Sequence, residues 1–346
     1  MMVFLFFLFL NSVLGVLAEN CDSCVDSGKT WCVEYSECYK TSNSSCTTQI
    51  DLRLNCPTLP KFEYDDEFVR SQIWVMLNAV MSKNPQLCFD NQLPTMKLYK
   101  RREVNCSEKY ENVTCAGYTA YDTTKKVIAI VFRGAIGQNQ VKDMTEKRDK
   151  FGLKSGFNVT NGKILAFVHE YAMKLLNDGM KQDLIELKRD YPDFELWVNG
   201  ISLGSNLAWA IATWIVDNGL YKPDDMKIIV MGAFRPGDYA FASWLTETFP
   251  YNFHVLHRSD PVSYLPRYLP VFNKTVFWPK TEVWYNNNMI PGEPFHVCQQ
   301  ADGDYCSALM KSSTPDDLDH LYYFNIDINR WGPDGCPKNI SAYGQP

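Results

Sequence analysis

Short apolar runs alternate with helix-like segments along most of this chain, and this alternation restricts its fold more than any other feature. The runs "VIAIVF", "FELWV" and "MKIIVMGAF" are almost continuously apolar, as strands buried on both faces of a sheet are. The segments "DDEFVRSQIWVMLNAVMSK", "KILAFVHEYAMKLL" and "NLAWAIATWIVDNG" repeat apolar residues at helical spacing. Two more strands are expected in "YNFHVLHRSDP" and "TEVWYNN". The pattern predicts an α/β fold whose central sheet is mostly parallel, with helices on both faces.

A five-residue pattern, Gly200-Ile201-Ser202-Leu203-Gly204, lies where an apolar strand gives way to a helix. The two glycines let the backbone turn sharply without a Cβ clash, so the Ser202 hydroxyl projects above the sheet beside the positive end of the helix. In such sheets functional sites lie at the carboxyl ends of strands. The pattern predicts that Ser202 is a nucleophile; a small residue in a tight turn is the alternative.

A serine hydroxyl attacks well only when a base takes its proton and a third group orients that base. Behind a serine of this kind the chain order is Ser, then Asp or Glu, then His. Asp260 ends an apolar run before a proline, which favours an extended exit into a loop; it is the expected acid, and an ordinary loop aspartate is the alternative. His296 and His320 follow it, and we expect His320 to be the base, because His296 equally suits the neighbourhood of a disulfide at Cys298. This order excludes His169, His254 and His257.

The oxyanion of an acyl-transfer intermediate needs hydrogen-bond donors that are already in place. The backbone N–H of Leu203, directly after the candidate nucleophile, is one expected donor. The loop "RGAIG" that leaves the run "VIAIVF" would supply the other through the N–H of Ala135. Taken alone, this stretch favours a plain buried strand with a charged end.

The front of the chain indicates secretion. Residues 1–18, "MMVFLFFLFLNSVLGVLA", are a short apolar run followed by small residues, as in a signal peptide with Val16-Leu17-Ala18 as its cleavage site. A membrane anchor is the alternative, but a spanning helix needs ~20 apolar residues. The 12 cysteines fit an oxidising compartment. Six N-x-S/T triplets predict glycosylation at Asn43, Asn105, Asn112, Asn158, Asn273 and Asn339.

Residues 19–57 are expected to form a small cysteine-rich cap, ahead of a main domain over residues 60–346. The cap holds Cys21, Cys24, Cys32, Cys38, Cys46 and Cys56. It has too little apolar content for a core, so disulfides must hold it together. The sequence does not choose among the pairings. A zinc site at Cys21-x-x-Cys24 is the alternative, although no second close pair completes a set of four ligands.

Charge restricts the partners of the chain. The formal net charge is −6, and no run of Lys and Arg exceeds three residues. We therefore expect no attraction to nucleic acid or to anionic lipid through a long-range field. The expected partner is a lipid or a small ester, and any peripheral contact with a lipid surface would be apolar. The sequence predicts no oligomeric state.

Six pieces in a fixed order resemble the fungal-type class 3 lipases of the α/β-hydrolase fold, over about residues 60–330. The pieces are "VIAIVFRGA", "VNGISLGSNLA", "IIVMGAFRPGDYAFA", "RSDPVSYLP", "TEVWY" and "HLYYF". The resemblance implies a catalytic triad at Ser202, Asp260 and His320, oxyanion donors at Ala135 and Leu203, and an elbow at Gly200 and Gly204. It implies no metal and no organic cofactor. The front segment "CDSCVDSGKTWC" is similar to plexin-type cysteine-rich caps ahead of some secreted members.

The chain departs from this family at three positions. Ile201 stands where His is common, and Ser205 stands where Gly is common. Ala135 stands where Ser or Thr usually adds a side-chain donor to the oxyanion. Loss of such a donor can lower turnover by a factor of ~10² to 10³, so a slow enzyme is expected.

The lid of this family falls on "IGQNQVKDMTEKRDKFG" in this chain. This segment is too charged to bury much of its surface in lipid, so the sequence argues against activation at a lipid interface. A surface loop without a gating role is the alternative.

Together these features predict a secreted lipase that cleaves acylglycerol esters through a Ser-Asp-His triad and an acyl-enzyme. One alternative is a lipase-like binding protein with weak or no turnover. Another is a phospholipase or feruloyl-type esterase, because fold and triad do not fix the acyl group or the leaving group.

Overall fold

The computed structural model describes residues 20–301, 306–308 and 316–345. The predicted signal peptide and its cleavage site lie outside these residues. The chain divides into two compact units, one up to Pro57 and one from Thr58 onward. Among the described helices, none is both long and apolar enough to cross a membrane.

The first unit is small and held together by disulfides. Helix α1 (Cys21–Asp26) is followed by a three-stranded antiparallel sheet in the order β2-β1-β3. The strands are β1 (Thr30–Cys32), β2 (Glu37–Tyr39) and β3 (Gln49–Ile50). The disulfides are Cys21–Cys56, Cys24–Cys38 and Cys32–Cys46. Because every cysteine of this unit is in a disulfide, the alternative of a zinc site at Cys21 and Cys24 is wrong.

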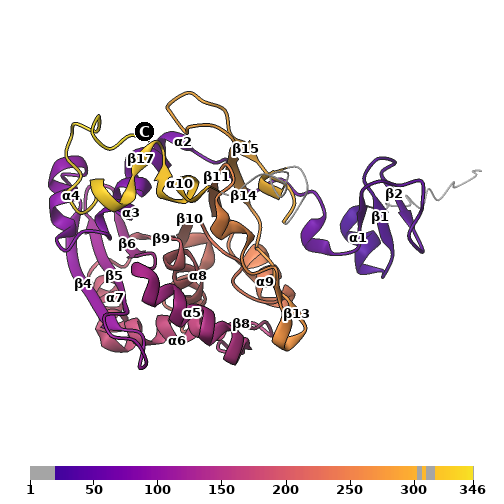
Figure 1. Ribbon diagram of the computed structural model, residues 1–346, viewed down its shortest axis with the longest axis horizontal. Coiled ribbons are helices and arrows are strands. Elements are labelled where there is room, and N and C mark those ends of the chain that lie inside the picture. The colour runs from indigo at the N-terminus through magenta and orange to yellow at the C-terminus, as the bar shows by residue number, and fades with distance from the viewer. Residues whose placement is uncertain (1–19, 302–305, 309–315, 346) are drawn as a thin grey trace, which may run out of the picture. The chain divides into compact units, whose positions relative to one another are not determined.

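The second unit is built on an eight-stranded sheet in the order β15-β14-β11-β10-β9-β6-β5-β4 (Figure 1). Neighbouring strands from β6 to β14 are parallel, and β4, β5 and β15 are antiparallel to their neighbours. The strands are β4 (Lys97–Asn105), β5 (Thr114–Asp122), β6 (Val127–Phe132), β9 (Glu195–Ile201), β10 (Met226–Met231), β11 (Asn252–His257), β14 (Glu282–Tyr285) and β15 (His296–Val297). The α/β prediction is therefore confirmed, with a mixed sheet that has a parallel centre.

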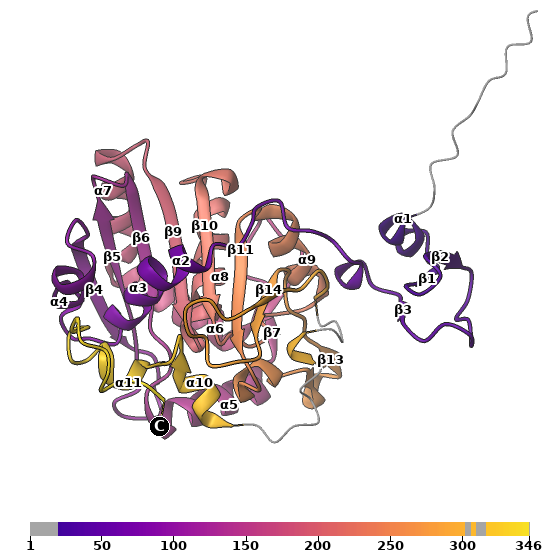
Figure 2. The ribbon, with the colours of Figure 1, turned by 90° about the horizontal axis from the view of Figure 1, so that it is seen from above.

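Helices cover both faces of this sheet because its strands are apolar on both sides. Along β6, Ile128, Ile130 and Phe132 enter one buried core, and the residues between them enter the other. One face carries α6 (Ala166–Leu175), α7 (Lys181–Asp190), α8 (Leu203–Asp217) and α9 (Tyr239–Thr248). The other carries α3 (Trp74–Ala79), α4 (Pro85–Gln92) and the C-terminal α11 (Ile328–Trp331) (Figure 2).

Further elements complete the second unit. They are α2 (Asp66–Phe68) with a π-helical turn (Val69–Ile73), α5 (Gly137–Phe151), β7 (Leu153–Lys154), β8 (Ile164–Leu165), β12 (Tyr268–Leu269), β13 (Lys274–Thr275), α10 (Asp317–Leu321), β16 (Tyr322–Tyr323) and β17 (Ile326–Asp327). Helix α5 occupies the predicted lid segment, which is therefore helical and not a loop. The disulfides of this unit are Cys88–Cys336, Cys106–Cys115 and Cys298–Cys306.

Candidate active site

Ser202 lies at the sharp junction between β9 and α8. Its backbone has φ 56° and ψ −125°, a conformation that costs energy for a residue with a side chain. The turn is tight enough to require both glycines. A Cβ on Gly200 would lie 2.0 Å from the carbonyl oxygen of Gly204, and a Cβ on Gly204 would lie 2.2 Å from the carbonyl oxygen of Phe132. The glycines therefore let β9, α8 and the end of β6 approach one another closely around Ser202.

The loop that follows β6 passes directly beside Ser202. A Cβ on Gly134 would lie only 3.1 Å from the Cβ of Ser202. Ala135, the next residue, lines both cavities that Ser202 lines. Leu203 is the first residue of α8, where backbone N–H groups have no acceptor within the helix. The structure thus brings Ala135 and Leu203, the two expected oxyanion donors, to Ser202.

Ser205 explains how the chain accommodates one departure from the family. Its side chain is buried, and its hydroxyl lies 2.7 Å from the carbonyl oxygen of Met231 and 3.0 Å from that of Gly200. A single hydroxyl proton can serve either acceptor. The hydroxyl therefore connects the start of α8 to the ends of β9 and β10, so it stabilises the turn instead of disturbing it.

Asp260 and His320 meet at the carboxyl ends of the strands. Asp260 is fully buried just after β11, and His320 lies on α10. His320 Nδ1 is 2.8 Å from Asp260 Oδ2 and 2.9 Å from Oδ1. Burial lowers the pKa of His320, but the charge of Asp260 and its hydrogen bond outweigh burial and raise that pKa above its ordinary value. The imidazolium form of His320 is therefore stabilised by Asp260, as a proton-transferring base requires.

Two further groups fix Asp260, and sequence reasoning did not find them. The hydroxyl of Tyr323 donates to Asp260 Oδ2 at 2.7 Å, and the backbone N–H of Val262 donates to Oδ1 at 2.9 Å. Tyr323 lies three residues after His320, in the aromatic run that the sequence shows. Gly232, directly after β10, is a further position that sequence reasoning missed: a Cβ there would lie 2.9 Å from His320 Cε1 and 3.0 Å from Asp260 Oδ2.

His257 contacts the segments next to Asp260 and His320. It is fully buried at the end of β11, with Nδ1 3.1 Å from the carbonyl oxygen of Asp319 and Nε2 2.8 Å from that of Asn287. Asp319 directly precedes His320, so the ring of His257 connects helix α10 to the loop after β14. Chain order excluded His257 as the base, and its buried bridging position gives it a structural role.

The ring contacts of the remaining three histidines are with aromatic residues other than those of the site. His296 is exposed on the edge strand β15, with its ring 5.9 Å from that of Trp284. His169 packs against Phe157, and His254 packs between Trp209 and Trp278. Burial lowers the pKa of His254 to about 3, so this ring is neutral at physiological pH. Of the two histidines that the sequence left open, the structure brings His320 to Asp260.

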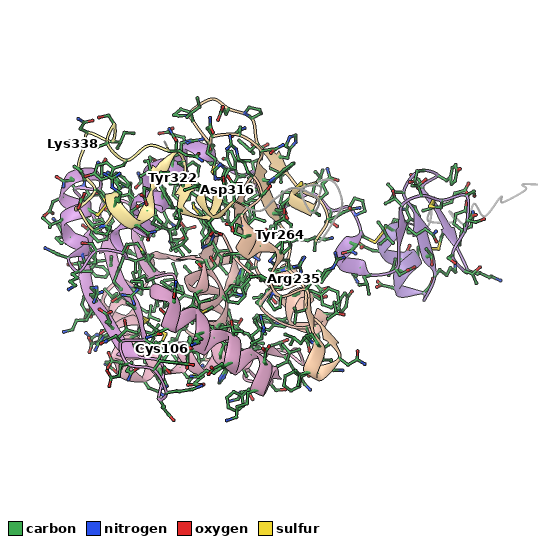
Figure 3. The ribbon with its side chains drawn as sticks, in the orientation of Figure 1. Cys106, Arg235, Tyr264, Asp316, Tyr322 and Lys338 are labelled. Atoms are coloured by element: carbon green, nitrogen blue, oxygen red, sulfur yellow. A yellow bond between two sulfur atoms is a disulfide. The ribbon has the colours of Figure 1, made fainter. Side chains whose placement is uncertain are left out.

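Two cavities meet at Ser202. One, of about 140 Å³, is almost entirely apolar and lies between α5 and the loop after β11; it is lined by Ala135, Val141, Met144, Thr145, Arg148, Phe167, Ser202, Phe234, Val262, Leu265 and Pro266. The other, of about 350 Å³, lies between Ser202 and residues of the C-terminal segment, among them His320 and Asn329. His320 lies on helix α10, whose two ends are marked in Figure 3 by the labelled residues Asp316 and Tyr322. A molecule bound across Ser202 would therefore reach into two different environments.

Two groups of ligand-type atoms occur among the described residues: Cys32, Glu34 and Cys46, and Glu282, Cys298 and Cys306. In each group both cysteines are joined in a disulfide. A cysteine binds a metal ion as its thiolate, so in this disulfide-bonded state each group keeps only its glutamate as a ligand.

Comparisons with known proteins agree with the geometry. The model of the family "Lipase (class 3)" matches residues 129–269. The uncharacterized protein C40H1.2 of Caenorhabditis elegans is 35% identical over 259 residues, which cover 75% of this chain and 93% of that protein. The secreted mono- and diacylglycerol lipase A of Penicillium cyclopium is 32% identical over 152 residues, 44% of this chain and 47% of the fungal one. The structure of the Rhizomucor miehei triacylglyceride lipase matches with a TM-score of 0.61 at 21% identity, over 77% of this chain and 97% of that one.

Proposed function

Because the chain belongs to the class 3 lipase family, we propose that it is a serine hydrolase that cleaves the esters of acylglycerols. The observation that carries this proposal is the contact of His320 with Asp260 beside a cavity that Ser202 also lines. The name of the Penicillium relative, a mono- and diacylglycerol lipase, supports the substrate class. No part of the reaction needs a metal or an organic cofactor.

In the proposed reaction Ser202 attacks the ester carbonyl while His320 takes its proton. Asp260 holds the imidazole in the required tautomer and stabilises the imidazolium that forms. The N–H groups of Leu203 and Ala135 donate to the developing oxyanion. His320 then gives its proton to the leaving alcohol, and water attacks the acyl-enzyme with the same base.

The two cavities distinguish the two halves of the substrate in this proposal. The leaving oxygen must lie next to the acid that protonates it, so the alcohol half lies in the cavity that contains His320. The acyl chain then lies in the smaller apolar cavity beneath α5, lined by Met144 and Leu265. With about 140 Å³ available, less than the ~300 Å³ of a typical small-molecule site, that cavity favours short acyl chains or chain ends that remain outside.

We also propose that the protein is secreted and glycosylated. Of the six N-x-S/T triplets, five begin at an exposed asparagine in the structure: Asn105, Asn112, Asn158, Asn273 and Asn339. Exposure is needed for an attached glycan. The 12 disulfide-bonded cysteines also suit an oxidising compartment. We propose further that the first unit is a cap of the plexin type.

Replacement of Ser202 by Ala tests this function. We expect the purified Ser202→Ala protein to keep its fold, lose ester hydrolysis and lose covalent labelling by a fluorophosphonate probe. His320→Ala should lose hydrolysis likewise, whereas the matched variant His296→Ala should retain it. Wild-type protein that binds lipid but neither reacts with the probe nor hydrolyses any ester would favour the binding-protein alternative, which the Ala135 departure motivates.

A further inference from the structure

Helix α5 presents two different faces, each repeated at helical spacing. Val141, Met144, Thr145 and Arg148 line the apolar cavity next to Ser202. The positions 140, 143 and 147 follow the same i, i+3, i+7 spacing on another side of the helix, and there Gln140 and Asp143 are buried. The second face bears polar side chains in a buried position, which is costly unless each is hydrogen-bonded.

Gln140 anchors the first turn of α5. Its side-chain oxygen accepts from the backbone N–H of Ile136 at 2.8 Å, and its side-chain nitrogen donates to the carbonyl oxygen of Thr114 at 3.1 Å. Gln140 is fully buried. One amide therefore connects the helix start, and with it the oxyanion loop at Ala135, to strand β5.

Asp143 anchors the middle of α5. Its carboxylate is buried, and it accepts a 2.6 Å hydrogen bond from the Ser107 hydroxyl and a short one from the hydroxyl of Tyr171 on α6. Lys147, one turn later, lies 3.4 Å from the same carboxylate. Movement of α5 away from the body would break these contacts together, and hydrogen bonds to a charged group are among the stronger ones in a protein. The contacts of Asp143 therefore oppose such a movement.

Glu146 and Lys147 anchor the third turn of α5. Lys147 Nζ donates to the carbonyl oxygen of Cys106 at 3.1 Å and to Glu170 at 2.8 Å. Glu146 accepts from the hydroxyl of Tyr110 at 2.6 Å. The partners Cys106, Ser107 and Tyr110 lie on the β4–β5 connection, which the Cys106–Cys115 disulfide closes; Cys106 is labelled in Figure 3.

From these contacts we propose that α5 is a fixed wall of the acyl cavity and not a lid, so that the protein hydrolyses dissolved, monomeric esters as readily as aggregated ones. The proposal rests on the hydrolase function proposed above. A lid that opens at a lipid surface needs two arrangements of similar free energy and a ligand that prefers one of them. Here α5 is hydrogen-bonded to β5, to α6 or to the disulfide-closed connection at Gln140, Asp143 and Lys147, over its first three turns. Ser202 already lines two cavities.

Hydrolysis of tributyrin across its solubility limit tests the proposal in the full-length protein. We expect the rate to follow a single saturation curve through that limit. Above the limit, the observed rate divided by the rate extrapolated from dissolved substrate should be near 1. A several-fold jump above the limit would overturn the proposal. If tributyrin is hydrolysed in neither form, the proposed function fails, and the exchange experiment below still tests the anchored helix.

Hydrogen exchange of the backbone amides in residues 137–151 measures the anchoring directly. In the wild type these amides should be as protected as those of α6, and Asp143→Ala should raise their exchange rates at least tenfold. Asn139→Ala, an exposed position on the same helix, is the matched control and should change neither exchange nor kinetics. If Asp143→Ala does not fold, Tyr171→Phe removes one of the two hydroxyl donors and should raise the exchange rates less. Unprotected wild-type amides, or unchanged exchange in a folded Asp143 variant, would overturn the proposal.

Discussion

The Tyr323→Phe substitution tests how Asp260 is held. Tyr323 is fully buried, and its hydroxyl donates to the same carboxylate oxygen that lies 2.8 Å from His320. A hydrogen bond to a charged group contributes about 1.5–3 kcal/mol, and Phe leaves the ring packing intact. We expect the Tm to fall by on the order of 3 to 10 °C, since 1 kcal/mol corresponds to a few degrees in a domain of this size.

The same substitution should lower kcat moderately and should shift the pH dependence of kcat/KM in one direction. Val262 and His320 still contact the carboxylate, so if ~1.4 kcal/mol of the loss is felt in the transition state, kcat falls about tenfold. Without the tyrosine donor more negative charge faces His320, which raises its already raised pKa further. Because the base must be neutral to act, the acid limb of kcat/KM should move to higher pH.

Steady-state kinetics on a soluble ester between pH 5 and 9, with thermal unfolding, would measure these effects. Tyr322→Phe is the matched control, because the hydroxyl of Tyr322 contacts Asp327 at 3.3 Å and not the site. It should leave the acid limb in place. An acid limb that stayed fixed or moved to lower pH in Tyr323→Phe would refute the reasoning about Asp260.

Three other predictions follow from the site and the first unit. Gly232→Ala should lower kcat by about 10², because its Cβ would lie 2.9 Å from His320, whereas Gly219→Ala, at a similar positive φ with nothing within 4 Å, should leave kcat unchanged. Ala135→Ser should raise kcat between a few-fold and ~10²-fold by adding an oxyanion donor; unchanged kcat in a folded variant would show that this donor is not needed. Deletion of residues 19–57 should leave esterase activity in the second unit, and complete loss in a folded product would contradict this.

The parts of the fold that depend on residues close together in the chain could be predicted from the sequence. The turn at Ser202 could be predicted because two glycines at a strand-to-helix change leave few other conformations. The parallel centre of the sheet could be predicted because β6, β9 and β10 are apolar on both faces. Strand β4, "KLYKRREVN", could not, because it is a charged edge strand whose burial pattern shows no clear alternation.

Contacts between distant segments could not be predicted where no recognised motif marks them. Nothing near Asp143 indicates that a residue of a highly charged helix becomes buried against Ser107 and Tyr171. The same holds for His257, whose ring nitrogens lie beside carbonyl oxygens 62 and 30 residues away along the chain. The aromatic run after His320 did give a signal for Tyr323, but only the folded structure shows which carboxylate its hydroxyl contacts.

The Cys88–Cys336 disulfide has a consequence for the biogenesis of the protein. It joins residues 248 positions apart, and in the chain-entropy model a loop of that length contributes about 5 kcal/mol. Its second cysteine, Cys336, comes after His320 in the chain. An incomplete chain on the ribosome therefore has Ser202 but lacks the proposed base and the bond that secures it. In the proposed mechanism, hydrolytic competence would therefore appear only after synthesis has passed His320, and the bond that secures this segment forms only after Cys336 has been added.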